Sequence, residues 1–97
     1  MSGFEFGKLG PIIVKDPQSL LDYAVDWTDW LGTDDIISVV WTVQQGIQKI
    51  RESNDLKIAK IELSGGSVGE VYSISCRITT GESRVDERTF RVHIRQK

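Results

Sequence analysis

The chain has 97 residues, 39% of them hydrophobic and 27% charged, and a formal net charge of -2. These values are typical of a single folded domain and argue against disorder. No segment approaches the ~20 apolar residues of a transmembrane helix, and the near-neutral charge gives no reason to expect nucleic acid as a partner.

The charge is unevenly distributed along the chain. Residues 1–35 sum to -5, residues 36–70 to 0 and residues 71–97 to +3. This gradient could give the folded molecule oppositely charged ends or faces. The alternative is that these charges belong to ordinary solvated strand faces.

Residues 1–10 contain three glycines and two phenylalanines, a composition that predicts a flexible arm rather than part of the core. Phe4 and Phe6 would then either fold back onto the domain or dock on a neighbouring subunit. The segment has neither a basic region nor an apolar run, so a secretory signal peptide is not expected.

The first strands are predicted from residue alternation. Residues 11–14 form a short extended piece that ends before Pro17. Residues 21–27 alternate bulky and acidic side chains, which favours a strand with its acidic side outward. Helix is the competing prediction for residues 17–31; we prefer a strand followed by a helical turn at residues 28–31, with Trp30 and Leu31 over the open end of the core.

A second strand is predicted over residues 35–43. Its alternation places Ile37, Val39, Trp41 and Val43 inward and Ile36, Ser38, Val40 and Thr42 outward. Ile36 and Val40 are apolar on this outward side. We therefore expect them to be covered by the N-terminal arm or to contact a partner.

The middle of the chain is less regular. Residues 44–55 are the least patterned, with a short strand at residues 47–50 as the best prediction. Residues 56–63 return to alternation and end at Gly65 and Gly66.

The C-terminal third predicts an antiparallel hairpin. Tyr72 begins a strand that runs to Thr79, and a partner strand over residues 89–95 follows a polar run, residues 79–88, in which Gly81 supplies the turn. Arg77, Arg91 and Arg95 lie on the outward side of this hairpin and could form a docking surface. The single cysteine, Cys76, points inward and cannot form an intrachain disulfide, which argues for a reducing compartment.

Six or seven strands without a convincing helix predict an all-β fold, an immunoglobulin-like antiparallel two-sheet β-sandwich of Greek-key type, formed by residues 11–97 as one domain. Trp41 on a central strand and Tyr72 at a corner support this choice. The inter-sheet disulfide of antibody domains is missing. We expect structural roles for Trp27, Trp41, Tyr72 and Phe90.

No catalytic, cofactor or metal site is predicted. His93, the only histidine, has no nearby cysteine and no nucleophile-elbow serine in sequence. The glycine-rich residues 65–69 lack the lysine and helix of a phosphate-binding loop. Five aspartates, Asp22, Asp26, Asp29, Asp34 and Asp35, form either a calcium site or a solvated acidic edge, and the absence of a D-x-D-x-D-G pattern favours the edge.

The chain resembles a family of small virion proteins of tailed phages and prophages, the fibre-tail adaptor or tail and neck accessory proteins. The resemblance covers residues 15–94. Its motifs are Asp16-Pro17, Leu21-Asp22-Tyr23, Asp26-Trp27, Trp30-Leu31-Gly32, Asp35-Ile36-Ile37 with Trp41, Leu63-Ser64-Gly65-Gly66, Gly69, Tyr72 and Arg88-Thr89-Phe90.

The resemblance implies a non-enzymatic tail, neck or baseplate adaptor, made in the host cytoplasm and located in the virion. Its partners would be other tail, neck or fibre proteins, with several copies of the chain in one assembly as an open possibility and no membrane contact. The alternative function is an immunoglobulin-like carbohydrate- or ligand-binding module that uses Trp30.

Overall fold

Seven strands and one short helix account for most of residues 11–96, the part of the chain that the computed structural model describes. The elements are β1 (Ile12–Lys15), β2 (Leu21–Asp26), α2 (Thr28–Leu31), β3 (Ile36–Val43), β4 (Ile47–Asn54), β5 (Ile58–Gly65), β6 (Val71–Thr80) and β7 (Val85–Ile94).

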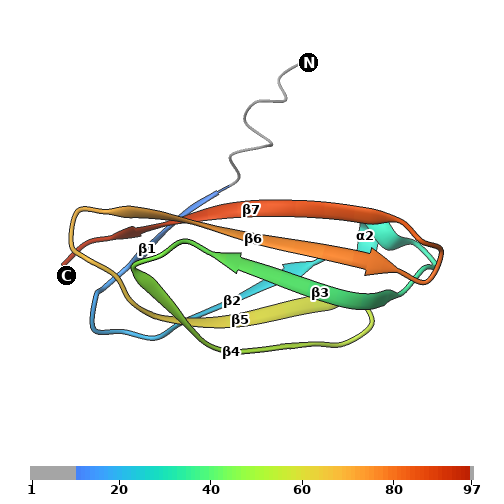
Figure 1. The fold of residues 1–97 in the computed structure, drawn as a ribbon, viewed down its shortest axis with the longest axis horizontal. Coiled ribbons are helices and arrows are strands. Elements are labelled where there is room, and N and C mark those ends of the chain that lie inside the picture. The colour runs from blue at the N-terminus through green and yellow to red at the C-terminus, as the bar shows by residue number, and fades with distance from the viewer. Residues whose placement is uncertain (1–10, 97) are drawn as a thin grey trace, which may run out of the picture.

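The strands form two sheets, which confirms the predicted all-β architecture. One sheet has the order β1-β7-β6-β3 and the other the order β2-β5-β4, and Figure 1 shows β6 and β7 in one layer above β4 and β5 in the other. Every pairing is antiparallel except β1 with β7. This arrangement is compatible with the predicted immunoglobulin-like sandwich.

A single hydrophobic core lies between the sheets. The core arises from the alternation of side chains along the strands, which is clearest in β6: alternate residues from Tyr72 to Ile78 are buried, and the residues between them face outward. The other sheet contributes buried side chains such as Val25, Ile61 and Leu63. One face of each sheet is therefore used for the core, and the opposite face is available for contacts.

The predicted strand and helical turn of residues 21–31 are both present. Strand β2 buries alternate side chains and ends where the Trp27 N–H donates to the Lys57 carbonyl at 2.9 Å. Helix α2 is a single turn, closed by the Leu31 N–H on the Trp27 carbonyl at 2.8 Å. Trp27 and Leu31 are buried, and Trp30 packs against the core.

The predicted orientation of the first residues of β3 is wrong. The pairing of β3 with β6 shifts between Ile36 and Ser38, so an extra residue reverses the alternation at this point. Ile36 is consequently 4% exposed in the core, whereas Ile37 is 67% exposed. After the irregularity the predicted order returns, with Trp41 inward and Val40 outward.

Two strands are longer than predicted. Strand β4 covers eight residues, Ile47–Asn54, rather than four. Strand β7 begins at Val85, so the polar run does not form a long loop but continues the hairpin on both sides of a tight turn. That turn is closed by the Thr80 N–H on the Arg84 carbonyl at 2.9 Å.

Tyr72 connects the corner before β6 to the sheet that it enters. Its hydroxyl accepts a hydrogen bond from the Ser67 N–H at 2.9 Å, as the corner role predicted from the sequence requires. Two glycines make room at this corner: a Cβ on Gly46 would lie 2.7 Å from the ring of Tyr72, and one on Gly66 would lie 2.6 Å from Ile94 and 3.3 Å from the Tyr72 ring. Both glycines have positive φ.

Lys15 fastens the end of β1 to the sandwich. Although a lysine, it is only 2% exposed, and its Nζ donates to the carbonyls of Asp16 at 2.8 Å and Gly65 at 2.9 Å. Burial lowers the pKa of this ammonium group. These two carbonyl oxygens accept hydrogen bonds that water would accept from an exposed ammonium group.

Candidate interaction surface

The four residues predicted to be structural all lie in the core. Trp27, Trp41, Tyr72 and Phe90 are buried, and the ring of Phe90 lies 4.0 Å from that of Tyr23, between centroids, joining β7 to β2. Because these side chains hold the two sheets together, contacts with other proteins must come from the outer faces, edges and ends.

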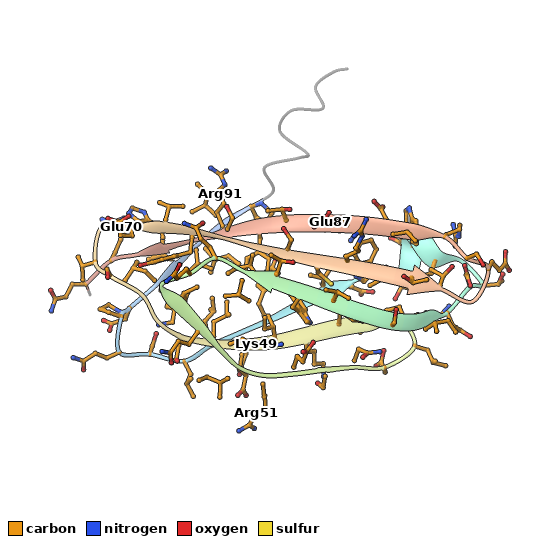
Figure 2. All side chains as sticks on the ribbon, viewed as in Figure 1. Lys49, Arg51, Glu70, Glu87 and Arg91 are labelled. Carbon is orange, nitrogen blue, oxygen red and sulfur yellow. The ribbon has the colours of Figure 1, made fainter. Side chains whose placement is uncertain are left out.

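The outer side of the four-stranded sheet, which we call the four-strand face, is the larger candidate surface. Figure 2 shows Arg91 directed away from the core on this side of the molecule. The strand registers and burial place the following side chains on it: Ile12, Val14, Ser38, Val40, Thr42, Val71, Ser73, Ser75, Arg77, Thr79, Val85, Glu87, Thr89, Arg91 and His93.

This face is rich in aliphatic and hydroxyl side chains and poor in charge. Exposed aliphatic residues on it include Ile12, Val14, Val40, Val71 and Val85, and Ile37 at the irregularity of β3 is exposed on the same side. In its centre the hydroxyls of Ser75 and Thr89 hydrogen bond at 2.9 Å. Depletion of charge around exposed aliphatic groups is typical of the core of a protein–protein interface.

The predicted interface residues are only partly brought together. Val40, Arg77 and Arg91 lie on the four-strand face, and Val40 is paired with Arg77 in the ladder. Arg95 is exposed just beyond the end of β7. Ile36 is buried, so its assignment to an interface is wrong, and Phe4 and Phe6 lie outside the described residues.

Four exposed aliphatic residues of this face were missed from the sequence. Ile12 and Val14 lie on β1, Val71 begins β6 and Val85 begins β7. Their alternation with inward residues was visible, but only the pairing of β1 with β7 shows that all four share one side of one sheet.

The outer side of the three-stranded sheet is charged instead. Asp22, Glu62 and Arg51 lie in one row across β2, β5 and β4, and Arg51 Nε is 3.2 Å from Glu62 Oε1. Figure 2 shows Arg51 directed away from this sheet. A shallow depression of about 390 Å³ lies over these strands, lined by Asp22, Lys60, Glu62 and their neighbours.

The aspartate-rich end of the sandwich is occupied by internal contacts. Asp34 is 5% exposed; it accepts hydrogen bonds from the Asp35 N–H at 2.9 Å and from Arg84 Nε at 3.1 Å. A hydrogen bond from the Thr80 side chain is the largest cause of the lowered pKa of Asp34. Asp34 therefore joins the β6–β7 turn to the corner before β3.

Trp30 does not offer the free ring that a sugar-binding platform needs. The Arg84 guanidinium lies 4.4 Å from the centroid of the Trp30 ring. The Trp30 ring also packs edge-to-face against the ring of Trp27, with the two ring centroids 5.5 Å apart. No aromatic residue is among the exposed large apolar side chains of residues 11–96, which counts against the carbohydrate-binding alternative.

The remaining reactive groups do not assemble into a site. His93 is half-buried between Val14 and Val71 on the four-strand face. Cys76 is buried, and burial raises the pKa of its thiol to about 11. Within residues 11–96, no three His, Cys, Asp or Glu side chains are grouped to hold a metal ion, and no helix is long and apolar enough to cross a membrane.

Comparison with protein-family models gives one finding that covers most of the chain. A model described as podophage GP4 fiber-tail adaptor protein gp77 matches residues 15–93. The matched range begins at the buried Lys15 and ends within β7, so it contains both sheets except for most of β1. No curated protein matches the chain.

Proposed function

The chain belongs to the podophage GP4 fiber-tail adaptor family, and on that premise we propose that it is a non-enzymatic virion protein that docks a neighbouring tail component, such as a fibre. The four-strand face is the docking surface. The observation that carries this assignment is the gathering of Ile12, Val14, Val40, Val71 and Val85 on one side of one sheet.

The two outer faces of the sandwich differ in the way that this role requires. Burial of aliphatic side chains on the four-strand face would favour association. The charged side chains on the outer side of the three-stranded sheet, here called the three-strand face, would instead have to lose their hydrating water on association. Arg77 and Glu87, which are cross-strand neighbours in the middle of the four-strand face, would then fix the orientation of the partner.

If several copies of the chain are present in one assembly, each contact between the four-strand face and its partner can be weak and the components still stay attached. Repeated copies that hold the same fibre or the same tail raise the effective concentration of each contact.

The role predicts that the protein is a stable part of purified particles. Mass spectrometry of gradient-purified virions should detect it at a constant ratio to other tail proteins through repeated purification. Its reproducible absence from particles would contradict the adaptor role.

The docking surface is tested with matched variants in a phage that depends on a plasmid copy of the gene. Val71→Glu places a charge on the four-strand face, and Ala24→Glu places one on the outer side of β2, where Ala24 is exposed. We expect the first variant to reduce fibre incorporation at least about tenfold, because an interface must then desolvate a carboxylate. The second variant should incorporate fibres normally; the opposite ranking would contradict the assignment of the face.

A further inference from the structure

The open edge of β3 has a composition different from every other open edge of the sandwich. Its eight residues, Ile36–Val43, contain no charged residue and no proline, and most of them are β-branched. Among residues 11–96, β6 is its only partner in the sheet. Long uncharged edges of this kind readily accept another strand.

The other edges carry features that oppose strand addition. Strand β2 has Asp22 and Asp26, and β4 has charged residues on both sides of an irregularity in its pairing. Strand β1 has only four residues. Beyond it, the Asp86 carboxylate accepts the Glu87 N–H at 2.8 Å on the exposed part of β7. These are the usual means by which natural sheets block their edges.

We propose that β3 pairs antiparallel with β3 of a second copy of this chain, so that the two four-stranded sheets form one continuous sheet. The inference goes beyond the proposed function, because it concerns contact between copies and does not depend on which tail component the four-strand face binds.

The backbone groups available for this pairing follow from the contact with β6. The Gln44 N–H donates to the Ser73 carbonyl at 3.2 Å, and the register continues without a break back to Ser38. In an antiparallel ladder, every second residue bonds to the same neighbour. Ser38, Val40 and Thr42 therefore bond to β6, and the N–H and C=O groups of Val39, Trp41 and Val43 face the open edge.

A two-fold axis at Trp41 makes this strand complementary to itself. Val39 then faces Val43 of the second copy, and on the outer side Val40 faces its Thr42. Each pair is β-branched and uncharged, which favours cross-strand contact. Val39 and Val43 point inward but are only half-buried, so a second strand would cover the part of the core that lies under this edge.

A second copy fits this edge better than a charged segment would. No charge on β3 could pair with an incoming acidic or basic side chain, and two uncharged strands meet without repulsion. The irregularity at Ile37 limits the pairing to residues 38–43. The contact is therefore short, and we expect weak association that depends on concentration.

The test combines sedimentation velocity with amide hydrogen exchange. Between about 20 µM and about 1 mM, the range in which small interfaces associate, the chain should change from monomer to dimer. The amides of Val39, Trp41 and Val43 should gain protection over this range. Those of Ser38, Val40 and Thr42, already bonded to β6, should change little.

Three variants distinguish this edge from other contacts. Val39→Pro removes an edge-facing N–H, and Thr42→Lys places a charge beside Val40 of the second copy; each should weaken dimerisation at least about tenfold. Val71→Lys alters the four-strand face at the start of β6, before the residues of that strand that pair with β3, and should leave dimerisation unchanged. Thermal melting identifies any variant that fails to fold, and Thr42→Lys, on an exposed position, keeps the test valid if Val39→Pro does so.

Two results would overturn the proposal. One is that the chain stays monomeric at about 1 mM. This result would also be obtained if the edge of β3 pairs only with a strand of another tail protein. The other is a dimer that persists in Thr42→Lys but is lost in Val71→Lys, which would place the contact on the four-strand face instead.

Discussion

Asp34 connects the corner before β3 to a residue far along the chain. Its carboxylate bonds to Arg84, fifty positions later, and to the backbone of Asp35, so the acidic N-terminal part of the sequence meets the basic C-terminal part. The charge gradient along the chain is thus partly balanced inside the fold.

We expect Asp34→Asn to be less stable than the unmodified chain at pH 7. The folded state lowers the pKa of Asp34 below its usual 3.8, so this carboxylate contributes its full stability above that value. The contribution is lost as the pH falls through the folded pKa, because the protonated acid no longer accepts these bonds. Urea unfolding of the two proteins should therefore differ at pH 7 and converge as the pH falls below about 4.

Asp29→Asn is the matched control, because Asp29 is an exposed residue in the first turn of α2. If Asp34→Asn were as stable as Asp29→Asn at pH 7, the carboxylate of Asp34 would not have the stabilising role described.

Cys76 should be unreactive in the folded protein. Its side chain is fully buried, and burial raises the pKa of the thiol to about 11, so little thiolate is present at pH 8. A chromogenic disulfide reagent should modify the native chain at least about a hundredfold more slowly than the urea-unfolded chain. Equal rates would mean that the inner side of β6 opens readily.

At the scale of elements, the Tyr72 corner sets how β6 enters the sheet. The hydroxyl of Tyr72 accepts the Ser67 N–H, and Tyr72→Phe would leave that donor without this acceptor. We expect the free energy of unfolding to fall by about 1 kcal/mol. Chemical denaturation measures this loss, and Tyr23→Phe on β2 is the control for removal of a phenol hydroxyl. Equal stability of the two variants would contradict a stabilising role of the Tyr72 hydroxyl at this corner.

Elements with unbroken alternation were predictable from the sequence alone. Strand β2, helix α2 and the inward residues of β6 lie where the pattern places them. Alternation is a local signal, so it fails where one extra residue enters a strand. Ile36 and Ile37 exchange sides for this reason.

Contacts between distant residues could not be predicted in the same way. The sequence around Lys15 gives no sign that its ammonium group is buried against the Gly65 carbonyl. The candidate surface was predicted only in part, through Val40, Arg77 and Arg91, because the place of β1 beside β7 depends on the whole topology. Family resemblance indicated the adaptor role, whereas the proposed docking surface could be identified only from the order of the strands in the sheet.

At the scale of the whole molecule, the sandwich formed by residues 11–96 has two different outer faces and one long open edge without charge, that of β3. The four-strand face carries the exposed aliphatic residues, the three-strand face carries charge pairs, and β3 lies at the border of the first. Pairing of β3 between copies would leave the four-strand face open and double its extent. The two contacts are therefore compatible in one assembly.

The most direct test of the adaptor role is a cryo-electron microscopy reconstruction of the intact tail at a resolution that shows side chains. If the four-strand face docks a tail component, density of a neighbouring tail protein should lie over Ile12, Val40, Val71 and Val85, with the charged face of Asp22 and Arg51 toward solvent. A particle in which the chain is present but the four-strand face is open to solvent would contradict it.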